Sequence, residues 1–415
     1  MNRKVIIGVA VMVAIATVLV ARVAIVTPQS GPKVTPLPDK EYDPAVWGRV
    51  YRLEYKGFQH NLEMSPSPTG FGGSIAYQKS EKEPEILINF KGFGFSRDYT
   101  EDRGHPYALE DLLKSKRVTP KSPGACMTCK TVNLIDVWQE KGWSYAKTPL
   151  AEIVPRLKQS ITCANCHDPQ TMKLRVINPA FIEAMRRRGI DISQTSRDQM
   201  RTYVCAQCHS EYYFEPETTK VVFPWDRGLE PEKIYDYYAA QPSGFASDWV
   251  HPESGVKLLK AQHPDFETWS TGVHGKAGVS CADCHMPYVR QNGVKHSSHW
   301  VTSPMKTWEA SCGACHDQEG KWLLDSVKST QDKVWQLQRT AGQAVARAHE
   351  GLAKAKASSA EMEEARELLR RAQWYWDFVA AENGMGFHNP ALALSTLGLS
   401  IEAANQALRR CGGAK

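Results

Sequence analysis

The sequence predicts a mainly α-helical fold with few short strands and long helices at its C-terminus. Five Cys-x-x-Cys motifs are spread through the 415 residues and begin at positions 126, 163, 205, 281 and 312. The segments between them are rich in proline, glycine and short polar runs, with only brief helical patterns such as residues 179–188. After the last motif, residues 321–357 and 359–381 place apolar side chains at spacings of three and four, as amphipathic helices do.

Four of the motifs end in histidine, which is the Cys-x-x-Cys-His spacing of covalent c-type haem attachment. A single Cys-x-x-Cys could instead be a zinc site, a disulfide or a thioredoxin-like redox pair. Because ten of the 11 cysteines fall in these motifs, we predict a multihaem cytochrome c fold organised around five covalent haems. The predicted attachment residues and proximal iron ligands are Cys126, Cys129, Lys130, Cys163, Cys166, His167, Cys205, Cys208, His209, Cys281, Cys284, His285, Cys312, Cys315 and His316.

The first motif differs from the others because Lys130 stands where they have histidine. An amine must lose its proton to bind iron, and the charge of a ferric ion favours that loss. A pure electron carrier gains nothing obvious from one altered ligand. The asymmetry therefore favours an enzyme with one special iron.

The N-terminus predicts export across the cytoplasmic membrane. Asn2, Arg3 and Lys4, two of them basic, precede an apolar run from Val5 to Val26. This run exceeds the roughly 7 to 15 residues of a cleavable signal and no clear Ala-x-Ala site follows it, so residues 1–26 favour an uncleaved anchor. Cleavage, which would give a soluble periplasmic protein, is the alternative. Residues 27–40 are rich in proline and predict an extended linker.

We predict two further parts after the linker, a pentahaem catalytic region at residues 41–320 and long C-terminal helices at residues 321–415. Haems, more than a continuous apolar core, should organise the first part. The formal net charge is +6, and each ferric haem with both propionates ionised adds about −1. The oxidised protein is then near neutral, and nothing in the sequence indicates a nucleic-acid partner.

The C-terminal helices carry recognisable start and stop signals. Ser358 is a predicted N-cap that forms a capping box with Glu361, and residues 383–384 are a predicted stop. We expect these helices to complete haem ligation and to contribute to a homodimer contact. Four aromatic residues on them could be core, haem-facing or intersubunit residues: Trp335, Trp374, Tyr375 and Trp376.

Histidines outside the motifs are numerous enough to supply distal ligands. Of 13 histidines, nine remain once the motif histidines are set aside. Low-spin haems commonly take a second histidine, so four bis-histidine haems would use four of the nine. The haem of Lys130 would then keep an open distal position. The nine are His60, His105, His251, His263, His274, His296, His299, His349 and His388.

The order of one Cys-x-x-Cys-Lys and four Cys-x-x-Cys-His motifs resembles that of pentahaem cytochrome c nitrite reductases. Further resemblance lies in CAQCHSEYY at residues 205–213, KAQHP at residues 260–264 and HPDFETWSTGVHGKAGVSCADCH at residues 263–285. The likeness runs from about residues 95–99 to residues 388–390, which is most of the chain after the N-terminal segment. The resemblance implies the six-electron reduction of nitrite to ammonium at the Lys130 haem, and side activity on nitric oxide, hydroxylamine or sulfite.

The same resemblance implies which residues surround that haem. Arg117, Tyr212 and His263 would line its distal pocket, where cationic and hydrogen-bonding groups suit an anion whose reduction consumes protons. For Arg117 the alternative is a solvated basic face shared with Lys114 and Lys116.

A calcium site beside this pocket is also implied by the resemblance. Its ligands would be the carboxylate of Glu211, the backbone carbonyls of Tyr212 and Lys260, and the side-chain amide of Gln262, all of them oxygen donors that suit a hard cation. For Glu211 the alternative is an ordinary ion pair.

The implied distal ligands follow in the same way. They are His105 for the haem of Cys205 and Cys208, His299 for that of Cys163 and Cys166, His388 for that of Cys281 and Cys284, and His274 for that of Cys312 and Cys315. His296 competes with His299, and His60, His251 and His349 are interpreted as structural or surface residues.

Nitrite and a multihaem electron donor, either a membrane quinol-oxidising cytochrome or a soluble carrier, are the expected partners. One rival hypothesis is a non-catalytic electron carrier, which predicts ligands on both faces of every haem. Another is a lysine-ligated enzyme acting on hydroxylamine or a sulfur oxyanion, a class that eight motifs would have favoured.

Overall fold

The computed structural model describes residues 34–101, 103–317 and 319–412. The predicted export signal or anchor at residues 1–26 lies outside the described residues, as does the beginning of the predicted linker. Within the described ranges, no helix is both long enough and apolar enough to cross a bilayer. The end of the predicted linker packs on the protein, because Leu37 is buried and its amide donates to the carbonyl of Pro169.

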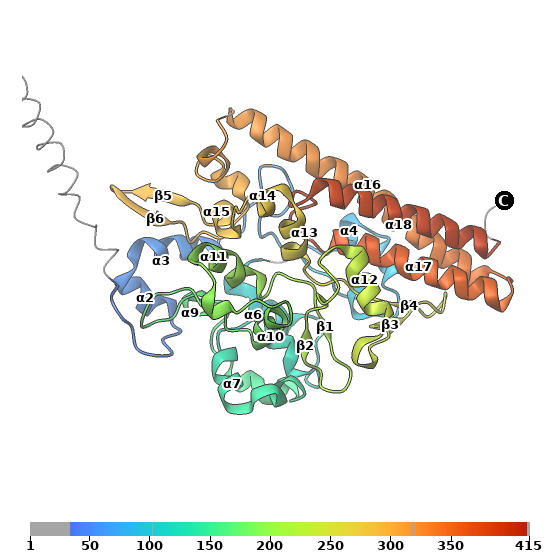
Figure 1. Cartoon of the computed structure of the whole chain (residues 1–415), viewed down its shortest axis with the longest axis horizontal. Coiled ribbons are helices and arrows are strands. Elements are labelled where there is room, and N and C mark those ends of the chain that lie inside the picture. The colour runs from blue at the N-terminus through green and yellow to red at the C-terminus, as the bar shows by residue number, and fades with distance from the viewer. Residues whose placement is uncertain (1–33, 102, 318, 413–415) are drawn as a thin grey trace, which may run out of the picture.

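The fold is mainly α-helical with few short strands, as predicted. Short helices and loops make up the part that carries the cysteine motifs, and long helices lie along one side of it (Figure 1). The shorter helices are α2 Pro44–Val50, α3 Arg52–Gln59, α4 Lys79–Lys82, α5 Ile86–Asn89, α6 Ala108–Lys114, α7 Leu134–Lys141, α8 Leu150–Ile153, α9 Cys163–Cys166, α10 Pro179–Arg187, α11 Arg197–Ala206, α12 Pro231–Ala239, α13 Asp265–Thr271, α14 Val273–Lys276 and α15 Cys281–His285. Antiparallel pairs are formed by β1 Tyr213–Phe214 with β2 Val221–Val222, β3 Trp249–Val250 with β4 Lys257–Leu258, and β5 Tyr288–Gln291 with β6 Val294–Ser297.

Several cysteine motifs occupy a single helical turn. Residues at positions i and i+3 of a helix lie on the same face, so the turn presents both thiols to one side. The turn at α15 begins with a capping box between Ser280 and Asp283, and that at α9 begins with one between Thr162 and Asn165. These capping boxes fix the start of each turn and so help to orient its two thiols.

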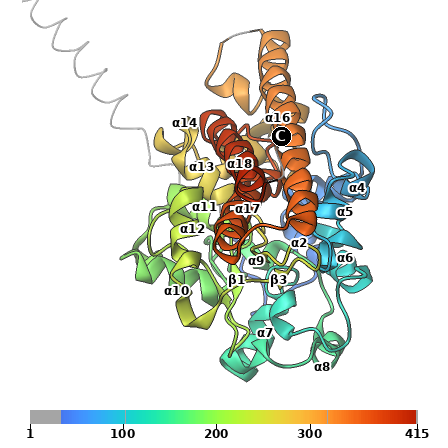
Figure 2. The ribbon, with the colours of Figure 1, turned by 90° about the vertical axis from the view of Figure 1, so that its right-hand side faces the viewer.

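Three long helices, α16 Gly320–Lys354, α17 Ser359–Ala380 and α18 Pro390–Arg410, pack side by side (Figures 1 and 2). The predicted break is confirmed, because Ser358 and Glu361 form a capping box at the start of α17. Helix α18 lies within the predicted C-terminal helical part, but the two helices named from the sequence end at residue 381 and α18 was not identified as a separate helix. Its signal is Asn389, whose side chain accepts from the amide of Leu392, followed by proline at the first helical position.

Burial in the core of this bundle distinguishes between the roles considered for its aromatic residues. Trp374, Tyr375 and Trp376 are all buried within the chain, so of the three roles left open by the sequence they are core residues. Trp335 is half-buried and packs near Phe71. Cys411, the one cysteine outside the motifs, is buried in the same core.

Replacing Leu369 in the centre of α17 should destabilise the bundle. Its side chain is fully buried among apolar neighbours, so Leu369→Ala should lower the free energy of unfolding by about 2–5 kcal/mol. Leu399→Ala in α18, where the side chain is 43% exposed, is the matched control and should cost less than about 0.5 kcal/mol. Urea unfolding followed by far-UV circular dichroism measures both, and equal losses would contradict this packing.

Candidate functional site

A cavity of about 2530 Å³ runs through the part of the chain that carries the motifs. All ten motif cysteines line it, together with Lys130 and the four motif histidines. Pockets for a single drug-sized ligand span about 300–1,000 Å³, so this space suits several large groups in contact. The residues predicted to hold haem are therefore gathered around one continuous space.

Each motif histidine faces one of the histidines predicted as distal ligands. An iron bonded to both imidazoles at about 2 Å from each nitrogen would hold the ring centroids roughly 6 Å apart. The observed centroid separations are 6.3 Å for His105 and His209, 6.2 Å for His167 and His299, 6.3 Å for His274 and His316, and 6.2 Å for His285 and His388. These separations fit four iron atoms with two histidines each. The ring of His263 also lies 6.1 Å from that of His209, so for that histidine the assignment of His105 rests on the family resemblance and not on the distance.

The structure also separates His299 from His296. His299 lines the cavity opposite His167, whereas His296 lies on strand β6 and pairs with Val289 of β5. Asn61 holds the segment around His299, because its amide nitrogen donates to the carbonyl of His299 and its oxygen accepts from the amide of Val301.

The histidines without a predicted role have structural contacts. His251 and His349 are buried and stacked with centroids 4.0 Å apart. His349 also hydrogen-bonds to Ser254 and Gln373. His60 packs edge-on against Trp300.

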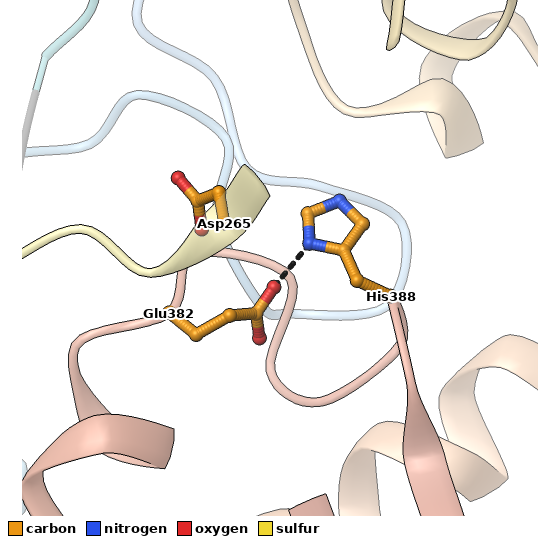
Figure 3. A group of neighbouring side chains, drawn as sticks. All are labelled: Asp265, Glu382 and His388. Carbon is orange, nitrogen blue, oxygen red and sulfur yellow. Dashed lines mark ion pairs between the residues drawn. The ribbon is translucent and has the colours of Figure 1, made fainter. Parts of the chain in front are cut away.

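Most of the facing histidines are held through Nδ1, which leaves Nε2 as the ligand nitrogen. Backbone carbonyls are the partners in three cases: Met172 for His167, Thr302 for His285 and Ser297 for His299. In two cases the partner is a carboxylate, Asp265 for His209 and Glu382 for His388 (Figure 3).

Interactions between thiols show which motifs are neighbours in space. Cys129 lies within hydrogen-bonding reach of Cys208, and Cys205 within reach of Cys281. Cys166 interacts electrostatically with Cys205, and Cys284 with Cys312. The motif of Cys205 and Cys208 therefore lies at a junction. It adjoins the motif that contains Lys130, the motif of Cys163 and Cys166, and the motif of Cys281 and Cys284.

Two of the residues expected in the distal pocket line the cavity, and one of them, Tyr212, interacts electrostatically with Cys126 and Cys129 of the first motif. Tyr212 and His263 both line the cavity with Lys130. Burial raises the pKa of Tyr212, chiefly because charging the phenol in this environment is unfavourable. The phenol therefore keeps its proton at neutral pH and can donate it in a hydrogen bond.

Arg117 is more buried than Lys114 and Lys116, with which it would share a solvated basic face. Lys114 is exposed and pairs with Glu110, whereas the guanidinium of Arg117 lies 4.0 Å over the ring of Phe95. Its Nε is buried without a hydrogen-bond partner among the described residues. The positive charge of Arg117 interacts electrostatically with Tyr212 and offsets part of the rise in the pKa of its phenol. A buried donor of this kind suits an anion.

The segments predicted to bind calcium meet behind Tyr212. Glu211 is fully buried, and its carboxylate accepts from the amide of Gln262 at 2.6 Å and from the hydroxyl of Tyr238 at 2.9 Å. The side-chain amide of Gln262 donates to the carbonyl of Lys260 at 3.3 Å. Burial raises the pKa of Glu211 well above its usual range, and a divalent cation beside it would favour the charged form.

Two acidic residues at this place were not found from the sequence. Glu267 accepts from the amide of Glu211, and burial raises its pKa to about 8. Its second oxygen is buried with no hydrogen-bond partner in the described chain, which fits a nearby cation. Asp377 of α17 forms a buried ion pair with the side chain of Lys260 at 2.8 Å. A Glu on α13 and an Asp inside a long helix carry no signal of this role in the sequence.

Comparison with known proteins gives a consistent family. The family model described as cytochrome c552 matches residues 43–411. Cytochrome c nitrite reductase subunit NrfA of Nitratidesulfovibrio vulgaris is 38% identical over 388 residues, which cover 86% of this chain and 72% of that protein. Cytochrome c-552 of Bacteroides thetaiotaomicron is 38% identical over 351 residues, which cover 81% of this chain and 70% of the relative.

A solved structure supports the same relation. The catalytic subunit of cytochrome c nitrite reductase from Desulfovibrio desulfuricans superposes with a TM-score of 0.87 and 36% identity, covering 92% of this chain and 88% of that one. That work describes two calcium sites in its protein. With the family model matching most of the residues and these relatives above a third identical, the chain belongs to the cytochrome c552 family.

Proposed function

We infer that the protein is an oxidoreductase that reduces nitrite to ammonium. The observation that carries this inference is the single cavity in which one Cys-x-x-Cys-Lys motif and four Cys-x-x-Cys-His motifs meet, and which Tyr212 and His263 also line. Relatives that share this family and cover most of the chain are cytochrome c nitrite reductases.

The predicted iron ligands that line the cavity are four pairs of histidines and one lysine. The pairs would each hold one covalent haem between two imidazoles, and Lys130 would hold the fifth from one side. When bound, the haems supply the electrons and the iron to which nitrite binds, in a six-electron reduction. The pairing of His274, His299 and His388 with the motif histidines supports this assignment through the centroid distances.

Arg117, Tyr212 and His263 would bind and protonate the substrate. Nitrite carries a negative charge, and the unpartnered Nε of Arg117 offers it a charge-assisted hydrogen bond. Tyr212 and His263 would donate hydrogen bonds to its oxygens and supply protons as the nitrogen–oxygen bonds break. The raised pKa of Tyr212 supports only the hydrogen-bonding part of this role, because the phenol stays protonated but becomes a weaker acid.

Calcium would be held by Glu211, the carbonyls of Tyr212 and Lys260, and Gln262. The closeness of Glu211, Lys260 and Gln262 supports this, as does the unpartnered buried oxygen of Glu267. The ion would fix the backbone on which Tyr212 and His263 stand, so its main effect is on the geometry of the pocket.

Covalent haem attachment beyond the cytoplasmic membrane places the activity in the periplasm. Membrane anchoring by residues 1–26 is our proposal, as are a homodimer and electron delivery by a multihaem donor. Nitric oxide, hydroxylamine or sulfite would enter the same pocket as side substrates.

The central test is ammonium formation from nitrite by haem-loaded protein with reduced viologen as the electron source. Wild-type protein should form ammonium, and His263→Ala should lower the turnover number by about 10²-fold or more because a positioned proton donor is lost. His60→Ala, a histidine outside the cavity, is the control and should keep full turnover. No ammonium from the wild type, with five low-spin haems, would leave an electron carrier.

Removing His299 should expose one face of the haem attached to Cys163 and Cys166. We expect His299→Ala to convert one low-spin signal to high-spin in the electron paramagnetic resonance spectrum, because the iron keeps only His167. His296→Ala tests the competing ligand and should leave every low-spin signal in place. The reverse result would assign the ligand to His296.

Glu211→Gln should release calcium from the purified protein. The change removes the charged ligand while it keeps the shape of the side chain, so bound calcium measured by mass spectrometry after gel filtration should fall. Glu217→Gln, an exposed glutamate in the next loop, should retain the wild-type calcium content. Equal calcium in both variants would argue for an ion held elsewhere.

A further inference from the structure

Asp265 lines the haem cavity, and Glu382 pairs with His388, which also lines it. Asp265 begins α13 and Glu382 follows the end of α17, and Figure 3 shows both side chains close to the ring of His388. Ligand atoms of these three residues all lie within 4.8 Å of one another. The histidine already faces His285 across the cavity, so the carboxylates act on a histidine committed to iron.

Asp265 is held rigidly against His209. Its Oδ2 accepts from Nδ1 of His209 at 2.9 Å, and the backbone and side-chain amides of Asn383 donate to its two oxygens at 2.7 Å each. The carboxylate is buried. These three donors therefore fix the position of the Asp265 carboxylate and favour its ionised form, which accepts hydrogen bonds.

Glu382 is held as firmly against His388. The carboxylate pairs with Nδ1 of the ring and accepts from the amides of Gly384 and Gly386 at 2.8 Å each. A Cβ at position 384 would lie 2.6 Å from Oε1 of Glu382, so a larger residue there would force the carboxylate to shift. The loop is built around the carboxylate.

Other predicted iron ligands have a neutral partner at Nδ1 in place of a carboxylate. Nδ1 of His167, His285 and His299 faces a backbone carbonyl, which is a neutral acceptor. A carboxylate draws the Nδ1 proton more strongly, so Nε2 becomes a stronger electron donor to the metal and stabilises the ferric state. The haem of Cys163 and Cys166 would have carbonyl-bound histidines on both faces.

We propose that Asp265 and Glu382 are positioning residues that make the haems of Cys205 and Cys281 harder to reduce than the haem of Cys163. The inference rests on the histidine ligation given under the proposed function. The motifs of Cys205 and Cys281 adjoin each other, and the first also adjoins the motif of Lys130. Electrons would thus be held less firmly on these two haems than on the haem of Cys163.

The test is a redox titration of the haem-loaded protein followed by electron paramagnetic resonance. Glu382→Gln and Asp265→Asn keep the side-chain shapes and remove the charges. Each should raise the midpoint potential of one low-spin signal, with about a tenfold change in the ferric-to-ferrous ratio at fixed potential, or about 59 mV. Glu83→Gln removes a buried carboxylate that accepts from Gln338 away from the cavity, and should shift no signal.

The outcomes separate this inference from the ligation on which it rests. Unchanged potentials in both variants, with every low-spin signal intact, would overturn the tuning role and leave ligation standing. A high-spin signal in Glu382→Gln together with an unshifted potential in Asp265→Asn would also overturn it. Fewer than four low-spin signals in the wild type would instead contradict the ligation.

Discussion

The pairing of histidines across one large cavity is the constraint on which the rest of this structure depends. Between residues 103 and 317 the chain forms short helices and loops in place of a single apolar core, and its buried clusters lie around the cavity. Side chains alone leave this space open, so covalent groups that fill it must supply much of the missing burial. The helices are consequently short where the motifs are dense, and long only in α16, α17 and α18 among the described residues.

A buried ion pair connects those long helices to the site. Lys260 and Asp377 are almost fully inaccessible, and the ammonium also lies near the rings of Phe90, Phe95 and Tyr99. The second oxygen of Asp377 accepts from the amide of Ala261, so α17 holds the backbone next to the proposed calcium ligands. Breaking such a pair leaves an unpaired buried charge, which costs about 3–5 kcal/mol. The bundle therefore supports the pocket as well as the fold.

The expectations from the sequence and the structure differ at features that depend on packing between residues far apart in the chain. The capping box at Ser358 was predicted because its partners are three residues apart, whereas α18 was not identified as a separate helix because its apolar residues are not confined to one stripe. The aromatic cluster at residues 374–376 could not be assigned from its pattern, since core and interface residues have the same composition. Arg117 could not be separated from Lys114 until the structure placed its guanidinium over Phe95.

The sequence by itself determined the number and type of haem motifs and the exceptional ligand Lys130, because covalent attachment depends on residues that are adjacent in the chain. With the family resemblance, it also indicated nitrite reduction. Only the tertiary structure decided that His299 and not His296 faces His167, and that carboxylates stand behind His209 and His388. These partners are far apart in the chain, and their meeting depends on how loops and helices close around the cavity, which no local pattern specifies.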